Sequence, residues 1–200
     1  NLDLAVVNFM SESLSILLGR GDGSFQMMTH YQVGNKPMSV IAKDFDNNGH
    51  LDLIVIDDRG ASLLLGSGQG TFHEAGTYKA GKGPVSATAA DFDGDGDLDL
   101  AVANINSDNI SILLSLSGKK GRTGTEDYSF YFQEAINYKV GDLPEFVTSG
   151  DWNGDGALDL VVANGRDGTV SVLLGLGNGV FQAATHYEVG SSPTSIATGD

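Results

Sequence analysis

Short apolar runs separated by turn residues follow one another along the whole chain of 200 residues. The segment 37–83 shows the pattern most clearly, because clusters of Gly, Asp and Ser bound each run. In this segment we expect strands at residues 37–42, 51–56, 61–65 and 71–79. The run at 51–56 is apolar at almost every position, which is typical of a strand buried on both faces. The pattern therefore predicts an all-β protein.

The same order of segments recurs, so the chain is built of repeats. The repeats run approximately over residues 1–36, 37–83, 84–143 and 144–192, with 193–200 starting the next. Repeats of four short strands are the sequence signature of a β-propeller, in which four-stranded blades pack face to face. We expect residues 1–200 to form a single propeller region with about four repeats. This region is either a small closed ring, with residues 193–198 completing the first blade, or a portion of a larger propeller.

The loop that joins the first and second strands of the third repeat is rich in carboxylates. It reads Asp91-Phe92-Asp93-Gly94-Asp95-Gly96-Asp97-Leu98-Asp99-Leu100. Such a loop suits a hard cation such as calcium, which takes six to eight oxygen ligands. Gly96 permits the sharp turn that folds the side chains around one ion. An EF-hand would need a glutamate at the twelfth position, which is Val102 here, so this loop joins two strands.

The acidic loop recurs at residues 44–53 and 151–160, which predicts three calcium sites. The side-chain ligands that we expect are Asp44, Asp46, Asn48 and Asp52; Asp91, Asp93, Asp95 and Asp99; and Asp151, Asn153, Asp155 and Asp159. The seventh residue of each loop should ligate through its backbone carbonyl, and these residues are His50, Asp97 and Ala157. Three nearly identical copies made of oxygen ligands indicate ions that stabilise the architecture, whereas catalytic metals more often have His ligands or an open position.

The formal net charge of −15 argues against binding to nucleic acid or to anionic membranes. Half of the 26 acidic residues lie in these loops or in the partial copies of the loop that contain Asp3 and Asp200, so bound Ca²⁺ would offset part of this charge. No apolar run is long enough for direct membrane insertion. Cysteine is absent, which excludes disulfides and thiol chemistry. Because weak calcium sites are filled outside cells, we expect an extracellular or cell-surface location.

Four motifs together resemble the FG-GAP/VCBS repeat family, which shares its pattern with the integrin alpha-subunit propeller. They are the Asp-x-Asp/Asn-x-Asp/Asn-Gly-x-Leu-Asp loops, the Ser-Val/Ile-Leu-Leu-Gly strand, the Gly-x-Gly-x-Gly-x-Phe turn and the Tyr-x-Val-Gly-x-x-Pro link. The resemblance covers essentially the entire chain. It implies a propeller, often seven-bladed, with calcium in the loop between the first two strands of a blade. It also implies functions that include adhesion, glycan binding and assembly.

We expect a calcium-stabilised extracellular β-propeller that acts as a binding or adhesion module for a glycan or protein partner. An alternative is a structural repeat protein that self-associates into a surface filament or scaffold. A glycan-active enzyme is a third reading, but it needs a converging acid and base. No unique His or paired carboxylate outside the loops provides one, so we expect no catalytic residues.

Other features have simpler interpretations. The tripeptide Arg20-Gly21-Asp22 aligns with ordinary turns at 67–69 and 176–178, so we do not expect an adhesion site. The recurring aromatic residues are expected to pack between blades; they are Tyr31, Tyr78, Tyr138 and Tyr187, and Phe25, Phe72, Phe132 and Phe181. His30 and His186 appear at a variable position before the tyrosine. The insertion at 115–131, which contains Lys119, Lys120 and Arg122, is either a functional loop or a solvated one.

Overall fold

The computed structural model describes residues 1–116 and 131–199, which form β-strands and turns and contain no helix. Accordingly, this part of the chain has no helix that could cross a lipid bilayer. The chain divides into two compact units, Asn1–Tyr78 and Lys79–Asp200, and each unit is described by itself.

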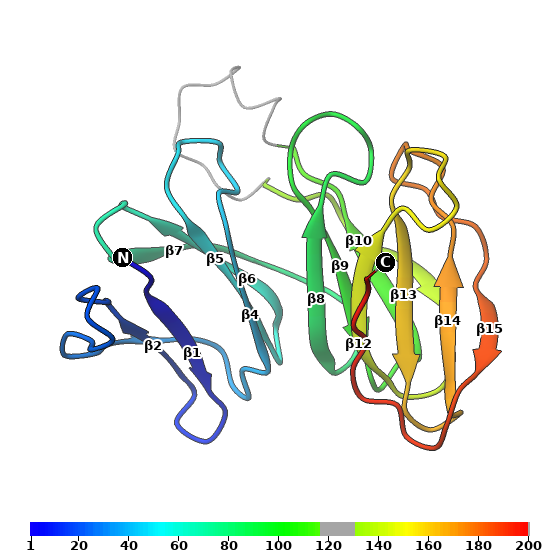
Figure 1. Cartoon of the computed structure of the whole chain (residues 1–200), viewed down its shortest axis with the longest axis horizontal. Helices are drawn as coiled ribbons and strands as arrows, with labels where there is room; N and C mark the ends of the chain where they lie inside the picture. Colours follow the sequence, from blue (N-terminus) through cyan, green and yellow to red (C-terminus); the bar gives the residue numbers. More distant parts are fainter. Residues whose placement is uncertain (117–130, 200) are drawn as a thin grey trace. The chain divides into compact units, whose positions relative to one another are not determined.

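The first unit consists of two antiparallel sheets whose strands follow chain order (Figure 1). The first sheet has three strands, β1 (Leu4–Asn8), β2 (Ser13–Leu17) and β3 (Thr29–Gln32). The second sheet has four strands, β4 (Ser39–Lys43), β5 (Asp52–Asp57), β6 (Gly60–Gly66) and β7 (Phe72–Tyr78). These last four strands lie where the alternation of apolar and turn segments predicts them.

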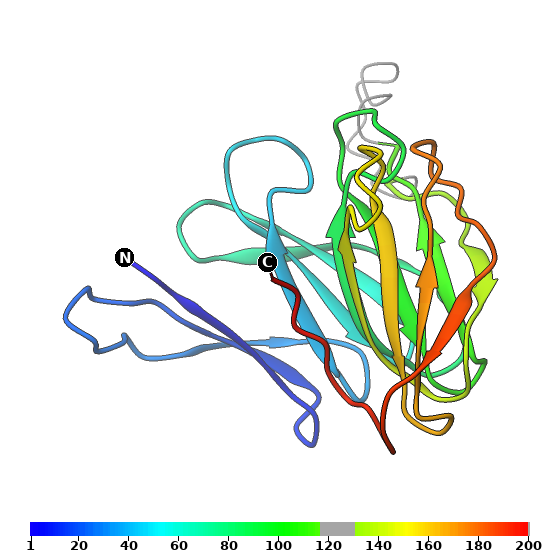
Figure 2. The ribbon, with the colours of Figure 1, turned by 45° about the vertical axis from the view of Figure 1, so that its right-hand side comes forward.

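The second unit consists of two four-stranded antiparallel sheets that stack face to face (Figure 2). One contains β8 (Pro84–Ala90), β9 (Asp99–Asn104), β10 (Asn109–Leu113) and β11 (Ile136–Lys139). The other contains β12 (Pro144–Gly150), β13 (Asp159–Asn164), β14 (Thr169–Leu173) and β15 (Thr185–Glu188). Residues 193–199 form no strand, so the expectation that residues 193–198 complete the first blade is wrong, and the first sheet has three strands. The prediction of an all-β, propeller-like fold is confirmed, with four-stranded sheets in the other three repeats.

The second strands of the blades are buried on both faces, as their unbroken apolar sequences predict. All six residues of β5 and all six of β9 are buried. Residues at alternate positions of such a strand point to opposite faces of the sheet, so burial of every position requires a covering layer on each side. Between the two sheets of the second unit, this layer is one cluster that includes Ala101, Ile112, Leu160 and Val162.

A row of buried polar side chains crosses the second and third strands of each sheet in the second unit. In β14, the fully buried Ser171 accepts hydrogen bonds from Asn164 Nδ2 (2.8 Å) and from the backbone N–H of Gly141 (3.2 Å). Ser111 in β10 has the equivalent contacts with Asn104 and with the N–H of Gly81. Each of these glycines is the Gly of the link motif that precedes the first strand of a sheet. The hydrogen bonds therefore attach the link to the third strand of the sheet that follows it.

Candidate metal centres

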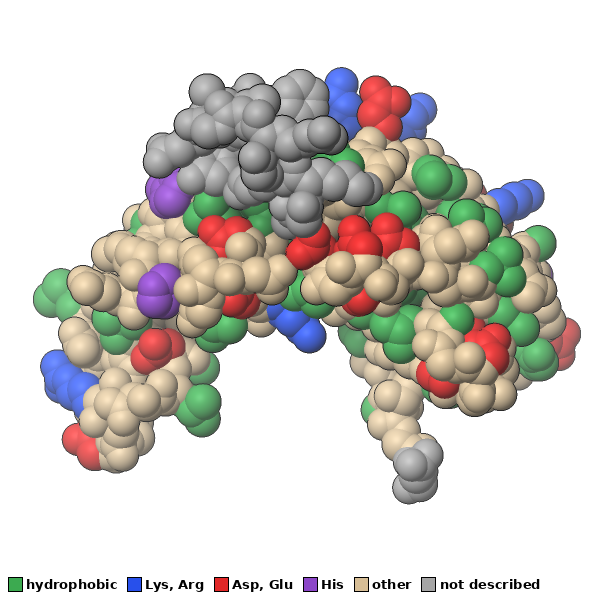
Figure 3. Space-filling model, turned by 90° about the horizontal axis from the view of Figure 1, so that it is seen from above, with side chains coloured by type: hydrophobic (Ala, Val, Ile, Leu, Met, Phe, Trp, Pro, Cys, Tyr) green, Lys and Arg blue, Asp and Glu red, His purple; other side chains and the backbone are tan. Residues whose placement is uncertain are grey.

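Each acidic loop lies between the first and second strands of a four-stranded sheet, as predicted. In the second unit, the loops 91–99 and 151–159 leave the same end of the two stacked sheets (Figures 1 and 2). Figure 3, which looks onto this end, shows Asp and Glu side chains at the surface. The sixth residues, Gly49, Gly96 and Gly156, have φ values of +86°, +91° and +87°. These left-handed backbone angles strongly favour glycine, which confirms the role predicted for Gly96.

The first aspartate of each loop holds the loop in its curled form. Both carboxylate oxygens of Asp91 accept backbone hydrogen bonds, from Gly94 (2.7 Å) and Gly96 (3.0 Å). Asp151 has the same contacts with Gly154 and Gly156, and Asp44 accepts from Asn48 and Gly49. The backbone of the loop therefore winds around the first carboxylate and orients it.

The last aspartate of each loop is a buried clamp between two chain segments. Asp99 is fully buried, and its two oxygens accept hydrogen bonds from the N–H of Phe92 (2.8 Å) and of Ser115 (2.7 Å). Asp52 and Asp159 are equally buried and make the equivalent pairs of contacts. The clamp joins the start of the loop to the residue that follows the third strand. Sequence reasoning predicted these aspartates only as ligands and missed the clamp, although an acidic residue inside an apolar Leu-Asp-Leu segment was its signal.

Two of the loops bring three carboxylates together. In each group the potential ligand oxygens lie within 4.8 Å of one another, and the groups are Asp44, Asp46 and Asp52, and Asp91, Asp93 and Asp99. Among the described residues, these are the two acidic groups with this spacing. The third loop also has three carboxylates, but Asn153 stands where the other loops have Asp46 and Asp93. Its Asp151, Asp155 and Asp159 do not form a group with this spacing.

The other predicted ligands form local turns within the loops. The Oδ1 atoms of Asn48, Asp95 and Asp155 each accept the backbone N–H two residues later, at 2.7, 3.0 and 2.8 Å. This contact is the Asx turn that Asn and Asp side chains favour. It fixes the backbone at the three seventh residues, which are His50, Asp97 and Ala157. The side chain of His50 is exposed and that of Asp97 is buried, whereas carbonyl ligation by these residues stays a prediction.

Burial and mutual repulsion disfavour ionisation of several loop carboxyls. Burial is the main cause that raises the pKa of Asp99 from 3.8 to about 6, with Asp93 and Asp95 adding repulsion. Burial also raises the pKa of Asp52 and of Asp93. A cation placed among such oxygens would favour the ionised carboxylates. The donor set is entirely oxygen, which fits a hard cation, so the two groups of three aspartates could hold a metal ion.

The segment Arg20-Gly21-Asp22 forms the turn that its alignment predicts. The N–H of Arg20 donates to the carbonyl of Ser24 (2.9 Å), as Ser67 does to Thr71 and Leu176 to Val180 at the same distance. The carboxylate of Asp22 accepts hydrogen bonds from the backbone and the hydroxyl of Ser24, which lower its pKa. The absence of adhesive function stays a prediction.

Four of the recurring aromatic residues join consecutive sheets within a unit, which confirms the packing role for them, whereas Phe25 and Tyr187 are exposed. The ring of Tyr138 meets that of Phe181 edge to face at 5.7 Å, and its hydroxyl accepts the N–H of Phe181 (3.2 Å). Tyr31 makes the same two contacts with Phe72, at 6.0 and 3.2 Å. The tyrosine hydroxyl thus satisfies a backbone donor of the next sheet.

The histidines before these tyrosines share a hydrogen-bonding role. The sequence did not indicate this role, because different residues occupy the position in the four repeats. Nδ1 of His30 lies 3.0 Å from Ser15 Oγ, and Nδ1 of His186 lies 2.9 Å from Ser171 Oγ. In the third repeat, Ser111 Oγ donates to Asn137 Oδ1 at the same position. The position therefore accepts many polar residues because each can hydrogen-bond the serine of the third strand.

The insertion predicted at 115–131 lies mostly outside the described residues, including Lys119, Lys120 and Arg122. Its two ends are described, and Ser115 forms a β-bridge with Phe132. The N–H of Leu116 donates to the carbonyl of Tyr131 (2.8 Å). The short turn of the last repeat closes in the same way, through the bridge between Gly175 and Phe181. The insertion thus begins and ends at the pair of residues that closes an ordinary turn.

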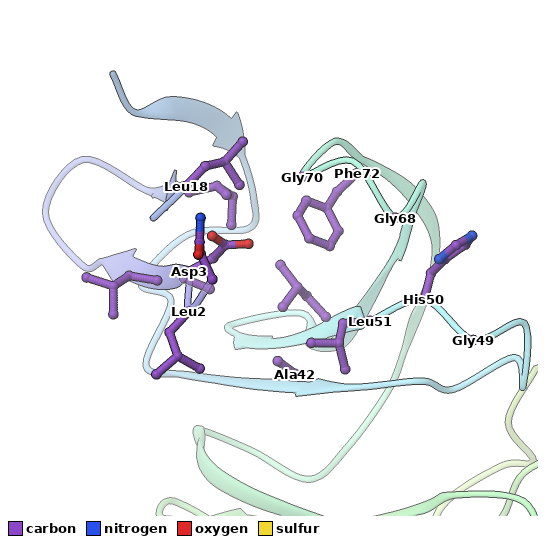
Figure 4. Close-up of a pocket in the computed structure, with 15 residues that line it drawn as sticks. Leu2, Asp3, Leu18, Ala42, Gly49, His50, Leu51, Gly68, Gly70 and Phe72 are labelled. Atoms are coloured by element: carbon purple, nitrogen blue, oxygen red, sulfur yellow. The ribbon is translucent and has the colours of Figure 1, made fainter. Parts of the chain in front are cut away.

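A pocket of about 370 Å³ lies between the two sheets of the first unit (Figure 4). Figure 4 shows the carboxylate of Asp3 and the ring of Phe72 facing each other across it, with His50 at the edge. Leu18 and Leu51 add apolar surface. The pocket combines an aromatic ring, aliphatic groups and a carboxylate, which suits a small ligand with both apolar and hydroxyl-bearing faces. Sequence reasoning did not predict this pocket because its residues come from two repeats.

Comparison with known proteins gives a family match and several similar folds. The family model for the FG-GAP-like repeat matches residues 1–55, 44–102 and 151–200. The comparison with curated proteins found no match. Among solved structures, BBS1N in complex with ARL6DN shares 15% identity over 96% of this chain and 53% of its own, with a TM-score of 0.61.

Two further solved chains have similar folds. An Agrocybe aegerita lectin, described as recognising non-reducing terminal N-acetylglucosamine, is 17% identical over 88% of this chain and 46% of its own, with a TM-score of 0.56. A Lactobacillus plantarum protein is 15% identical over 93% of this chain and 54% of its own, with a TM-score of 0.61. This chain therefore spans about half the length of the solved chains that it matches.

Proposed function

Because the chain belongs to the FG-GAP-like repeat family and has a propeller-like fold, we propose that it is a calcium-stabilised extracellular or cell-surface module that binds a glycan. The family match and the fold support a binding module in general. The calcium, the location and the glycan are the parts that we propose. We propose no catalytic activity for the module, since the loop carboxylates accept backbone N–H hydrogen bonds that fix the loops.

The observation that carries the calcium proposal is the grouping of three carboxylates in each of two loops. Asp44, Asp46 and Asp52 would hold one ion, and Asp91, Asp93 and Asp99 would hold a second. The ion would supply the positive charge that the crowded carboxylates lack, and it would stabilise the two ends of the loop against each other. The third loop, with Asn153, would bind more weakly because its three carboxylates are not grouped in this way.

The extracellular location follows from the proposed kind of calcium site. Several predicted ligands are exposed, for example Asn48 and Asp95, and an exposed loop with solvated ligands suits the weak sites of extracellular modules. Calcium is abundant outside cells, so such sites would be filled there. Secretion of the full-length protein, measured by its recovery from culture medium rather than from cell lysate, tests this part.

The pocket between the sheets of the first unit supports a glycan as the partner. The ring of Phe72 offers an apolar face to a sugar ring, and Asp3 offers an acceptor for its hydroxyl groups. The similar fold of a lectin that recognises terminal N-acetylglucosamine adds support. A protein partner is the second candidate, because another solved chain of this fold is BBS1N in complex with ARL6DN.

A glycan array probed in calcium tests the glycan proposal, and His50→Ala probes the pocket. His50 lies at its edge, and Ala157 occupies the equivalent loop position in the fourth repeat, so the substitution should leave the loop folded. His73→Ala is the matched control, because His73 is an exposed histidine of the same unit outside the pocket. We expect glycan binding that His50→Ala weakens and His73→Ala does not. An array without any bound glycan, or equal effects of the two variants, would contradict the proposal.

A further inference from the structure

Consecutive sheets within a unit meet through one kind of contact. We call the face that a sheet turns toward the preceding sheet of its unit the front face, and the opposite face of a sheet the back face. In each contact, a front face packs on the back face of the sheet before it. In the second unit, the front face of β12–β15 presents Leu160, Val162 and Phe181. The back face of β8–β11 receives them with Ile110, Ile112 and Tyr138. The Tyr138 hydroxyl accepts the Phe181 N–H and so fixes the register of the two sheets.

The first unit uses the same contact with the equivalent residues. The front face of β4–β7 presents Leu53, Val55 and Phe72, and the back face of β1–β3 receives them with Leu14, Ile16 and Tyr31. The hydrogen bond from the Phe72 N–H to the Tyr31 hydroxyl recurs at the same length of 3.2 Å. The same contact in two separate units therefore shows which residues a front face and a back face need.

The front face of the first sheet carries these residues but leaves them exposed. Leu4, Val6 and Phe25 occupy the positions of Leu160, Val162 and Phe181 in the register of the strands. They are 45%, 43% and 37% exposed, whereas their equivalents in the last sheet are 0%, 0% and 5% exposed. Leu2 and Met28 extend this exposed apolar surface. An apolar surface of this kind on a folded protein indicates an interaction site.

The back face of the last sheet is the matching half. Tyr187 and Val189 occupy the positions of Tyr138 and Val140. Tyr187 is 55% exposed and Val189 is 56% exposed, whereas Val140 is 2% exposed. Val170 and Val172 in β14 are also only partly buried, although the equivalent Ile110 and Ile112 are fully buried. One chain thus presents an exposed front face and an exposed back face of complementary design.

We propose that a second copy of this chain docks on the first, with the front face of β1–β3 of one copy on the back face of β12–β15 of the other. Phe25 of one copy takes the place of Phe181, with its ring against Tyr187 of the other copy and its N–H donated to the Tyr187 hydroxyl. Edge-to-face aromatic pairs of this kind add specificity to the buried apolar area.

The complementarity of the two faces favours a second copy as the occupant. The exposed front face carries Leu4, Val6 and Phe25 at the positions that pack on a back face. The exposed back face carries Tyr187 and Val189 at the positions that receive a front face. The contact is heterologous, because different surfaces meet, and it can therefore close into a ring or extend into a filament.

Light scattering coupled to size-exclusion chromatography tests the proposal in calcium at about 0.15 M salt, where the repulsion between acidic copies is screened. Leu4→Asp removes the front face and Tyr187→Asp removes the back face. Val180→Asp is the control, because this 41% exposed valine lies in the turn between β14 and β15, away from both faces. We expect the wild type and the control to associate and each face variant to be monomeric.

An equimolar mixture of the two face variants gives the sharpest result. Leu4→Asp keeps an intact back face and Tyr187→Asp keeps an intact front face, so together they can form one contact and no more. We expect a one-to-one dimer from two proteins that are monomeric alone, which also shows that both variants are folded. If Leu4→Asp does not fold, Val6→Asp on the same face replaces it.

Three results would overturn the proposal. A monomeric wild type would show that the two faces do not join two copies of the chain. Association that survives both face variants would place the interface elsewhere. Folded face variants that remain monomeric in the mixture would show that the two surfaces are not partners. None of these outcomes depends on glycan binding.

Discussion

The substitution Asp99→Asn separates the structural role of the buried clamp from the energetic effect of its charge. Asp99 is fully buried, and both of its oxygens accept backbone hydrogen bonds. Asparagine has the same shape and keeps one acceptor oxygen, but it leaves one buried N–H facing an amide NH₂ group. That lost hydrogen bond costs about 1–3 kcal/mol and does not vary with pH.

The charge of Asp99 has the opposite effect on the metal-free protein, and it varies with pH. Burial raises the pKa of Asp99 from 3.8 to about 6, so the native state favours the protonated carboxyl. The stabilisation of the native state by protonated Asp99 is complete below pH 3.8 and is lost as the pH rises through about 6. At about 1.4 kcal/mol for each tenfold change in acid dissociation constant, the loss is at most about 3 kcal/mol, less any solvent screening.

Urea unfolding of the chelator-treated protein between pH 4 and pH 8 measures this effect. The free energy of unfolding of Asp99→Asn relative to wild type should increase by about 2–3 kcal/mol across this range, because the constant cost of the lost hydrogen bond cancels. Glu134→Gln, an exposed substitution outside the loops, is the control and should show no such trend. A relative stability of Asp99→Asn that does not change with pH would refute the reasoning.

Three further predictions concern the turns and the contacts between sheets. Tyr138→Phe should lower the free energy of unfolding by about 0.5–1.5 kcal/mol in urea unfolding, because a backbone N–H loses its acceptor. In the Leu4→Asp background, which blocks contact with a second copy, Tyr187→Phe at the exposed equivalent position should have little effect; equal effects would contradict this account. Asp22→Glu should leave cell attachment unchanged in an adhesion assay, and loss of attachment with an unaltered melting curve would disprove the turn interpretation. Replacing 117–130 with a turn of the length of 177–179 should preserve the circular dichroism spectrum, since the closing pair of residues is kept; an unfolded product would show that the insertion belongs to the core.

Most of the fold could be predicted because the repeats fix it several times over. The apolar runs that predict strands at 51–56 and 61–65 coincide with β5 and β6. The acidic loops lie where their spacing places them, and the glycine at the sixth position has the left-handed angle that the sharp turn requires. Local patterns of this kind reflect backbone geometry and strand burial, which act over a few residues.

Other features depend on contacts between repeats, which a pattern within one repeat does not contain. The hydrogen bond of Tyr138 with the next sheet and the buried row through Ser171 join residues far apart in sequence. The clamp of Asp99 could have been inferred from a carboxylate inside an apolar strand, because a buried charge requires hydrogen-bond partners. Its partner Ser115, on another strand end, could not have been identified before the register was known.

The central claim is that calcium bound in the acidic loops stabilises the fold, and a thermal melt with and without chelator, together with a count of bound calcium, tests it most directly. An ion that binds only the native state adds about 2.7 kcal/mol per site at a hundredfold excess over Kd. Since typical domains are stable by about 5–15 kcal/mol, chelation should lower the melting temperature markedly without necessarily unfolding the chain. We expect three bound ions, with the site at 151–159 the weakest. An unchanged melt with fewer than two ions bound would contradict the account.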